Sequence, residues 1–128
     1  MRTPRTAREA AWLSLVHWRK MIRWVEKQDP DEPVGFFHMQ AEISTNWDGQ
    51  YCALCTWTKA WALRHRERKG NGNNVTTCSF CPLAKKYGPC GGAINAWAYV
   101  SMTFSWKEWL KHGRRMEQQL EAVWKELQ

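Results

Sequence analysis

The chain has 128 residues, a formal net charge of +7 and ten tryptophans. This length is typical of one domain, so we expect a single unit over residues 1–128. Ten large indoles cannot all be enclosed in a core of this size, so some should stay partly exposed. No apolar run resembles a secretory signal or is long enough to span a bilayer. The composition therefore favours a cytoplasmic protein with anionic partners and excludes the membrane.

The first predicted element is a long helix that begins after Thr6. Residues 6–9, TARE, have the form of a capping box, in which Thr6 and Glu9 each satisfy a free amide of the helix start. Apolar residues then recur at spacings of three and four, as on one helix face. They are Ala11, Leu15, Trp18, Ile22 and Val25. Two prolines in QDPDEP, residues 28–33, end this pattern.

The segment 34–51 has no clean helical period. Four of its apolar residues alternate, as is typical of a short strand. They are Phe37, Met39, Ala41 and Ile43. The tripeptide WDG at 47–49 predicts a turn that leads into Cys52.

Shorter elements are predicted in the following part of the chain. Apolar spacing indicates a helix over residues 55–69, which the loop GNGNN ends. Pro82 suits a first helical position and Gly88 a helix C-cap, so one or two helical turns are expected between them. Residues 93–104 fit a helix and a strand equally well.

The last predicted element is a second long helix. Ser105 and Glu108 form another capping box. The apolar positions after it again have helical spacing. They are Trp109, Gly113, Met116, Leu120, Val123 and Leu127. Gly113 would allow a neighbouring group to approach closely.

Two cysteine pairs are the strongest chemical signal. CALC at 52–55 is followed by CSFC at 78–81, in a chain with five cysteines. Two thiolates three residues apart can face one ion, and two such pairs complete the sulfur tetrahedron that Zn²⁺ prefers. An odd count and a reducing cytosol make disulfides the weaker interpretation. We therefore predict a structural zinc site with the ligands Cys52, Cys55, Cys78 and Cys81.

Other ligands and another cofactor remain open. Cys90, in GPCGG, could replace one of the four cysteines or add a fifth, and His17 is a less favoured ligand. An iron–sulfur cluster is the main alternative to zinc, because a proline directly follows the second pair. A thioredoxin-like redox pair is less favoured, since no βαβ pattern surrounds either motif.

The expected fold class is mainly α. Two long amphipathic helices should pack around a central, metal-stapled, cysteine-rich knuckle with short irregular or β segments. None of the phosphate-loop, zinc-protease or zinc-deaminase motifs is present, so we expect a protein that is not an enzyme.

Several segments together resemble a known group of proteins. SLVHWRKM at 14–21, WDGQYCALC at 47–55 and CSFCPLAKKYGPCGG at 78–92 are similar to small cysteine-motif proteins of tailed bacteriophages. The resemblance covers most of the chain in order, and the cysteine segments are its specific part. It implies a phage origin, a bacterial host cytoplasm and a shared metal knuckle. Because the group's pattern includes HW, it also draws attention to His17 and Trp18, which we expect to be structural.

Basic residues gather on one flank of the first helix and at the end of the second. Cations interleaved with an indole suit nucleic acid, where they meet phosphates and the ring stacks on a base. The candidate contacts are Arg8, Trp12, Arg19, Arg23, Arg64, Arg66, Arg68 and Lys69. The alternative is a solvated face on which arginines lie over Trp12 by cation–π contact.

The predicted function is that of a phage-encoded, zinc-stabilised binding protein that binds nucleic acid through these surfaces. The second hypothesis is a phage effector that inhibits a host defence or transcription protein, with exposed tryptophans as anchors. The third is an iron–sulfur protein.

Overall fold

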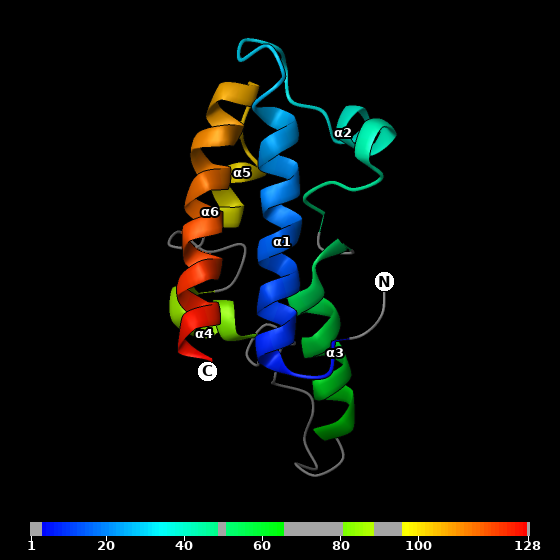
Figure 1. Cartoon of the computed structure of the whole chain (residues 1–128), viewed down its shortest axis with the longest axis vertical. Helices are drawn as coiled ribbons and strands as arrows, with labels where there is room; N and C mark the ends of the chain where they lie inside the picture. The colour runs from blue at the N-terminus through cyan, green and yellow to red at the C-terminus, as the bar shows by residue number, and fades with distance from the viewer. Residues whose placement is uncertain (1–3, 49–50, 66–80, 89–95, 128) are drawn as a thin grey trace.

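The computed structural model describes residues 4–48, 51–65, 81–88 and 96–127. Six helices are found in these ranges (Figure 1). They are α1 (Ala7–Val25), α2 (Phe36–Ile43), α3 (Ala53–His65), α4 (Pro82–Tyr87), α5 (Ala96–Val100) and α6 (Trp106–Glu126). The predicted mainly helical class is confirmed. No strand occurs in the described ranges, and the one extended pairing there is an isolated bridge between Pro33 and Ser105.

The two long helices α1 and α6 lie side by side and run in opposite directions (Figure 1). The predicted stripe of α1 is buried throughout, and that of α6 is buried up to Val123. Both helix starts are capped as expected, because Thr6 and Ser105 accept from the amides of Glu9 and Glu108. Local periodicity and capping therefore predict the central pair of helices correctly.

The shorter helices pack around this pair. α3 lies against α1, while α4 and α5 lie against α6 (Figure 1). The expected turns after Pro82 form α4, with Gly88 as its C-cap at a φ of 82°, a value that favours glycine. Within the ambiguous segment 93–104, residues 96–100 are the helix α5. Residues 66–69, the predicted end of the second helix, lie outside the described ranges.

The strand predicted around residues 37–43 is wrong, because these residues belong to α2. Only Met39 of the four alternating residues is buried, and Phe37 is 85% exposed. A tertiary bond favours the helix instead: the indole N–H of Trp24 donates to Glu42 Oε2 at 2.8 Å. Within α2, His38 lies one turn from Glu42, 3.3 Å from its carboxylate.

Tryptophans form the centre of the core. Five of the ten are buried: Trp18, Trp24, Trp47, Trp106 and Trp109. The rings of Trp18 and Trp109 stack across the α1–α6 seam with centroids 5.8 Å apart. Trp12 is 40% exposed and Trp57, Trp61, Trp97 and Trp124 are partly buried, so the expectation of partly exposed indoles is confirmed.

Gly113 makes room for a ring of its own helix. A β-carbon at Gly113 would lie 2.8 Å from Cζ3 of Trp109, which is fully buried and cannot easily shift. Gly113→Ala would gain up to about 1 kcal/mol of helix propensity but overpack the seam, at about 1–3 kcal/mol. We expect a net loss of about 1 kcal/mol in the free energy of unfolding, measured in urea. Gln118→Ala on the exposed side of α6 is the control, and an equally stable Gly113→Ala variant would contradict this packing.

Candidate functional site

Cys52 directly precedes α3, and several hydrogen-bonding groups lie close to its sulfur. The thiol of Cys55 contributes most, which lowers the pKa of Cys52 to about 6 although burial opposes the shift. The backbone N–H groups of Cys55 and Leu54 also face this sulfur. Amides at a helix start have no partner within the helix, so they stabilise a thiolate there. Both cysteines of the first pair therefore face a common position.

Cys81, from the second pair, lies near this position. It is the N-cap of α4, and its sulfur faces the amides of Ala84 and Leu83. Burial raises the pKa of the Cys81 thiol, and the charge on Cys52 raises it further. That electrostatic effect places the two sulfurs in the same neighbourhood, although 28 residues separate them in sequence.

Two predicted ligand positions, Cys78 and Cys90, lie outside the described residues. Among the residues that are described, no three His, Cys, Asp or Glu side chains stand close enough to hold a metal ion together. Cys52, Cys55 and Cys81 are not joined to one another by a disulfide. The three described cysteines thus converge in part, and the predicted complete knuckle is not shown.

His17 has other partners. Its Nε2 lies 2.7 Å from Thr45 Oγ1, and the backbone of Asn46 is close to the ring, although Nδ1 forms no hydrogen bond with a described residue. The neighbouring Trp18 is buried in the α1–α6 seam. Both residues therefore have the structural contacts expected of them.

Burial lowers the pKa of His17 from 6.5 to about 4. Between these values the unfolded chain takes up a proton that the folded chain does not, so stability is full above about pH 6.5 and falls as the pH drops toward 4. The loss is roughly 2–3 kcal/mol, since part of the ring remains in solvent. In denaturant titrations across this range, His17→Gln should give the flatter dependence on pH. A variant with the same slope as the wild type would contradict this role for His17.

The predicted aromatic and basic contacts at the start of α1 meet the end of α6. Trp12 packs on Trp124 with ring centroids 5.0 Å apart, and the guanidinium of Arg8 lies 5.2 Å from the Trp124 centroid. A shallow cleft of about 370 Å³ lies here, with Thr6, Glu9 and these three side chains as its walls. The expected cation–π contact exists, but it is made to Trp124 rather than to Trp12.

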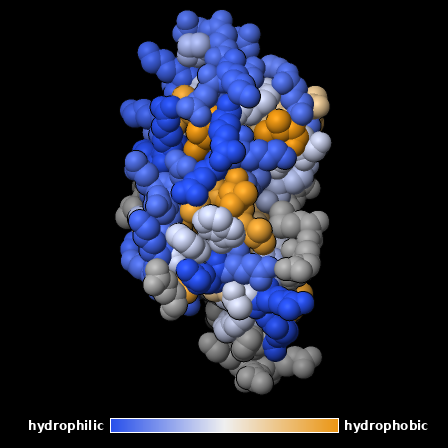
Figure 2. Space-filling model, in the orientation of Figure 1, coloured by the Kyte–Doolittle hydropathy of each residue, from blue (hydrophilic) through white to orange (hydrophobic). Residues whose placement is uncertain are grey.

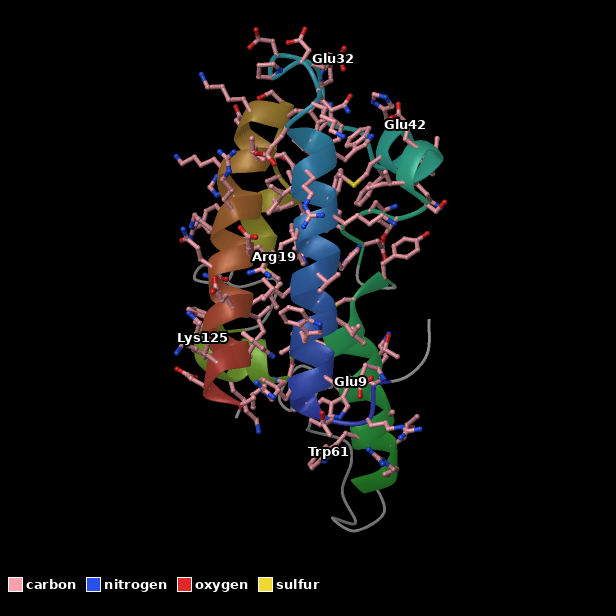
Figure 3. The ribbon with its side chains drawn as sticks, in the orientation of Figure 1. Glu9, Arg19, Glu32, Glu42, Trp61 and Lys125 are labelled. Carbon is pink, nitrogen blue, oxygen red and sulfur yellow. The ribbon has the colours of Figure 1, made fainter. Side chains whose placement is uncertain are left out.

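The other predicted cations differ in their partners. Arg19 Nε lies 3.0 Å from Glu117 Oε2 on α6, so its charge is compensated (Arg19 is labelled in Figure 3). Arg8, Arg23 and Arg64 are exposed and form no ion pair with a described residue. The remaining candidates, Arg66, Arg68 and Lys69, are not among the described residues.

The start of α1 and the end of α3 lie at the same end of the molecule. The two helices pack against each other in opposite directions, and Figure 3 shows Glu9 of α1 and Trp61 of α3 at that end. Arg64, the first residue of the second basic cluster, follows Trp61 by about one turn of α3. The two basic clusters therefore start from neighbouring helices.

Sequence reasoning missed an apolar part of the surface and two buried hydroxyls. Leu13 and Val16 are 36% and 44% exposed, and hydrophobic atoms interrupt the hydrophilic surface over the middle of α1 (Figure 2). Ser14 and Thr58 are each 1% exposed, and their hydroxyls lie near the cysteines. The sequence signal that could have revealed these two hydroxyls is a small polar residue within an apolar helical pattern.

No protein family, curated protein or solved structure matches the chain. Of the helices in the described ranges, none combines the length and apolarity that crossing a bilayer requires.

Proposed function

We propose that this chain is a zinc-stapled binding protein without enzymatic activity. Cys52, Cys55, Cys78 and Cys81 would hold the ion, and Cys90 remains a possible substitute. The partial convergence of Cys52, Cys55 and Cys81 supports the site, because these residues come from two separate pairs. A phage origin and action in the bacterial cytoplasm belong to the same proposal.

The residues present fit a soft cation. The Cys52 sulfur is surrounded by donors that favour a thiolate, the form that binds metal. Thr58 Oγ1, beside Cys81, is buried without a well-formed hydrogen bond to any described residue. A metal-bound thiolate would give that donor an acceptor. When bound, zinc would supply a cross-link between the segments that carry the cysteines.

The partner that we propose is nucleic acid. The observation that carries this proposal is the open face of α1. Arg8 and Arg23 are exposed there and form no ion pair with a described residue, and Trp12 is 40% exposed between them. Cations without carboxylate partners gain most from phosphates, because binding releases the counterions of the nucleic acid. The exposed indole offers a surface for base stacking.

Binding to labelled single-stranded oligonucleotides at several salt concentrations tests this function. With about four phosphate contacts, affinity should fall roughly 50-fold between 50 and 200 mM salt. Arg8→Glu and Arg23→Glu should weaken binding and each flatten the salt slope by about one unit. Lys107→Glu, at the start of α6, makes the same change in net charge and should bind almost as the wild type does. Binding that is absent, independent of salt, or equally weakened by Lys107→Glu would refute the function.

One observation favours a host protein as the second candidate partner. A cleft of about 340 Å³ lies between α1 and a second wall formed by Ser44, Thr45, Tyr51 and Ala53. The exposed Leu13 and Val16 form part of the α1 wall. Aliphatic side chains suit a protein interface better than a phosphate backbone. A pull-down from nuclease-treated host lysate should then retain a stoichiometric partner, which Val16→Glu loses. Phe37→Glu, a change at another exposed apolar residue, is the control.

A further inference from the structure

Two buried hydroxyl groups flank the cysteines that come from different parts of the chain. Ser14 on α1 lies beside Cys52, and Thr58 on α3 lies beside Cys81. Each residue is 1% exposed, so neither hydroxyl can turn to bulk water for a partner. A buried hydroxyl without a hydrogen bond costs about 1–3 kcal/mol, so each should have a defined role.

Ser14 joins α1 to the start of α3 by two contacts. Its Oγ accepts a hydrogen bond from the backbone N–H of Leu54 at 3.2 Å. The hydroxyl proton then remains free, and Cys52 Sγ lies 3.9 Å from the same oxygen. Because a hydroxyl has one proton to donate, that proton is available to the sulfur. The Ser14 hydroxyl therefore contacts both Cys52 Sγ and the backbone N–H of Leu54.

Thr58 is placed to do the same for the second sulfur. It lies three residues after Cys55, on the same side of α3. Its hydroxyl faces Cys81 closely enough to lower the pKa of that thiol. The contact is not a well-formed hydrogen bond, and Thr58 Oγ1 has no other partner among the described residues. A thiolate bound to a cation is a stronger acceptor than a neutral thiol, so the Thr58 hydroxyl would gain a partner when Cys81 binds the ion.

We propose that Ser14 and Thr58 are positioning residues of the metal centre, which orient the sulfurs of Cys52 and Cys81 toward a bound cation. The inference rests on the proposed zinc site and adds two residues to it. Groups that hydrogen-bond to metal ligands fix the orientation of those ligands, and their loss commonly weakens metal binding 10–100-fold. Since the two hydroxyls come from α1 and α3, metal affinity would also depend on the packing of these helices.

The test is a comparison of zinc affinity between variants of the full chain, by competition with a chromophoric chelator. Ser14→Ala and Thr58→Val remove the hydroxyls with little change in volume, and each should bind zinc 10–100-fold more weakly. Thr58→Ser keeps the donor and should restore most of the affinity. Ser101→Ala and Thr103→Val are matched controls, since those hydroxyls donate to backbone carbonyls at the end of α5. Substitution of Co²⁺ gives a second readout, because its visible spectrum reports the arrangement of thiolates around the ion.

The possible outcomes separate the two proposals. If the wild type binds neither zinc nor cobalt, the metal centre itself fails and this inference with it. If the wild type binds zinc and the Ser14 and Thr58 variants bind it equally well with the wild-type cobalt spectrum, only the inference fails. Circular dichroism of each variant shows whether weaker binding comes from an unfolded chain. If the variants without the hydroxyl do not fold, the zinc affinity of Thr58→Ser is compared with that of the wild type. This variant keeps its hydroxyl, so a loss of zinc affinity in its folded form would refute the positioning role of that hydroxyl.

Discussion

Removal of the metal is expected to unfold the centre of the chain. The proposed ligands belong to segments that adjoin α3 and α4, and each of these helices contacts only one of the two long helices extensively. Without the ion, the sulfurs are no longer cross-linked. The free energy of metal binding then no longer contributes to the free energy of folding. Chelation should therefore lower stability by several kcal/mol, or about 10 °C or more in Tm. Thermal unfolding followed by circular dichroism, with and without a strong chelator, measures the change.

Single substitutions of cysteine by serine should assign the ligands. Cys52→Ser, Cys55→Ser, Cys78→Ser and Cys81→Ser should each abolish the bound zinc, whereas Cys90→Ser should leave one ion per chain in elemental analysis. Retention of zinc after one of the first four changes, with its loss in Cys90→Ser, would identify Cys90 as the substitute ligand. A brown protein that absorbs visible light would show that the cofactor is an iron–sulfur cluster instead of zinc. If the metal-free chain had the same Tm as the chain purified without a chelator, the proposed stabilising metal site would be refuted.

Trp109→Ala is expected to remove a large share of the stability of the fold. Its ring is fully buried and stacks on Trp18, and it contacts Trp47 and Trp106 at centroid distances of 5.7 and 6.2 Å. Truncation would leave a cavity where α1, α6 and the segment before α3 meet. Such changes cost about 4 kcal/mol, against a total of about 5–15 kcal/mol for a typical domain. Urea unfolding should show the loss as a lower midpoint with little change in slope.

Trp12→Ala is the matched control for this prediction. The two residues have the same side chain, but Trp12 is 40% exposed and has its main ring contact with Trp124 at the surface. Trp12→Ala should lower the free energy of unfolding by only about 1 kcal/mol, because this substitution removes less buried apolar area than Trp109→Ala does. Similar losses for the two variants would show that the core is not centred on Trp109.

Local pattern was sufficient for the central helices and their ends. The apolar residues of α1 and α6 recur with the helical period, and that period depends only on residues within a few positions. The capping residues Thr6 and Ser105 act on amides three residues away. Order and spacing also predict that CALC pairs with CSFC, and this stays a prediction, because the structure describes only Cys52, Cys55 and Cys81 of the proposed ligands.

The sequence by itself determined which segments are helical over most of the chain, which faces are apolar, and which residues carry sulfur or positive charge. Only the tertiary structure decided which of these groups meet. It pairs Arg19 with Glu117, and it makes residues 36–43 a helix whose Glu42 accepts from Trp24. It also encloses the hydroxyls of Ser14 and Thr58 beside the cysteines. The physical reason is that helix periodicity is local, whereas ion pairs, buried hydrogen bonds and ligand sets join residues that are far apart in the chain.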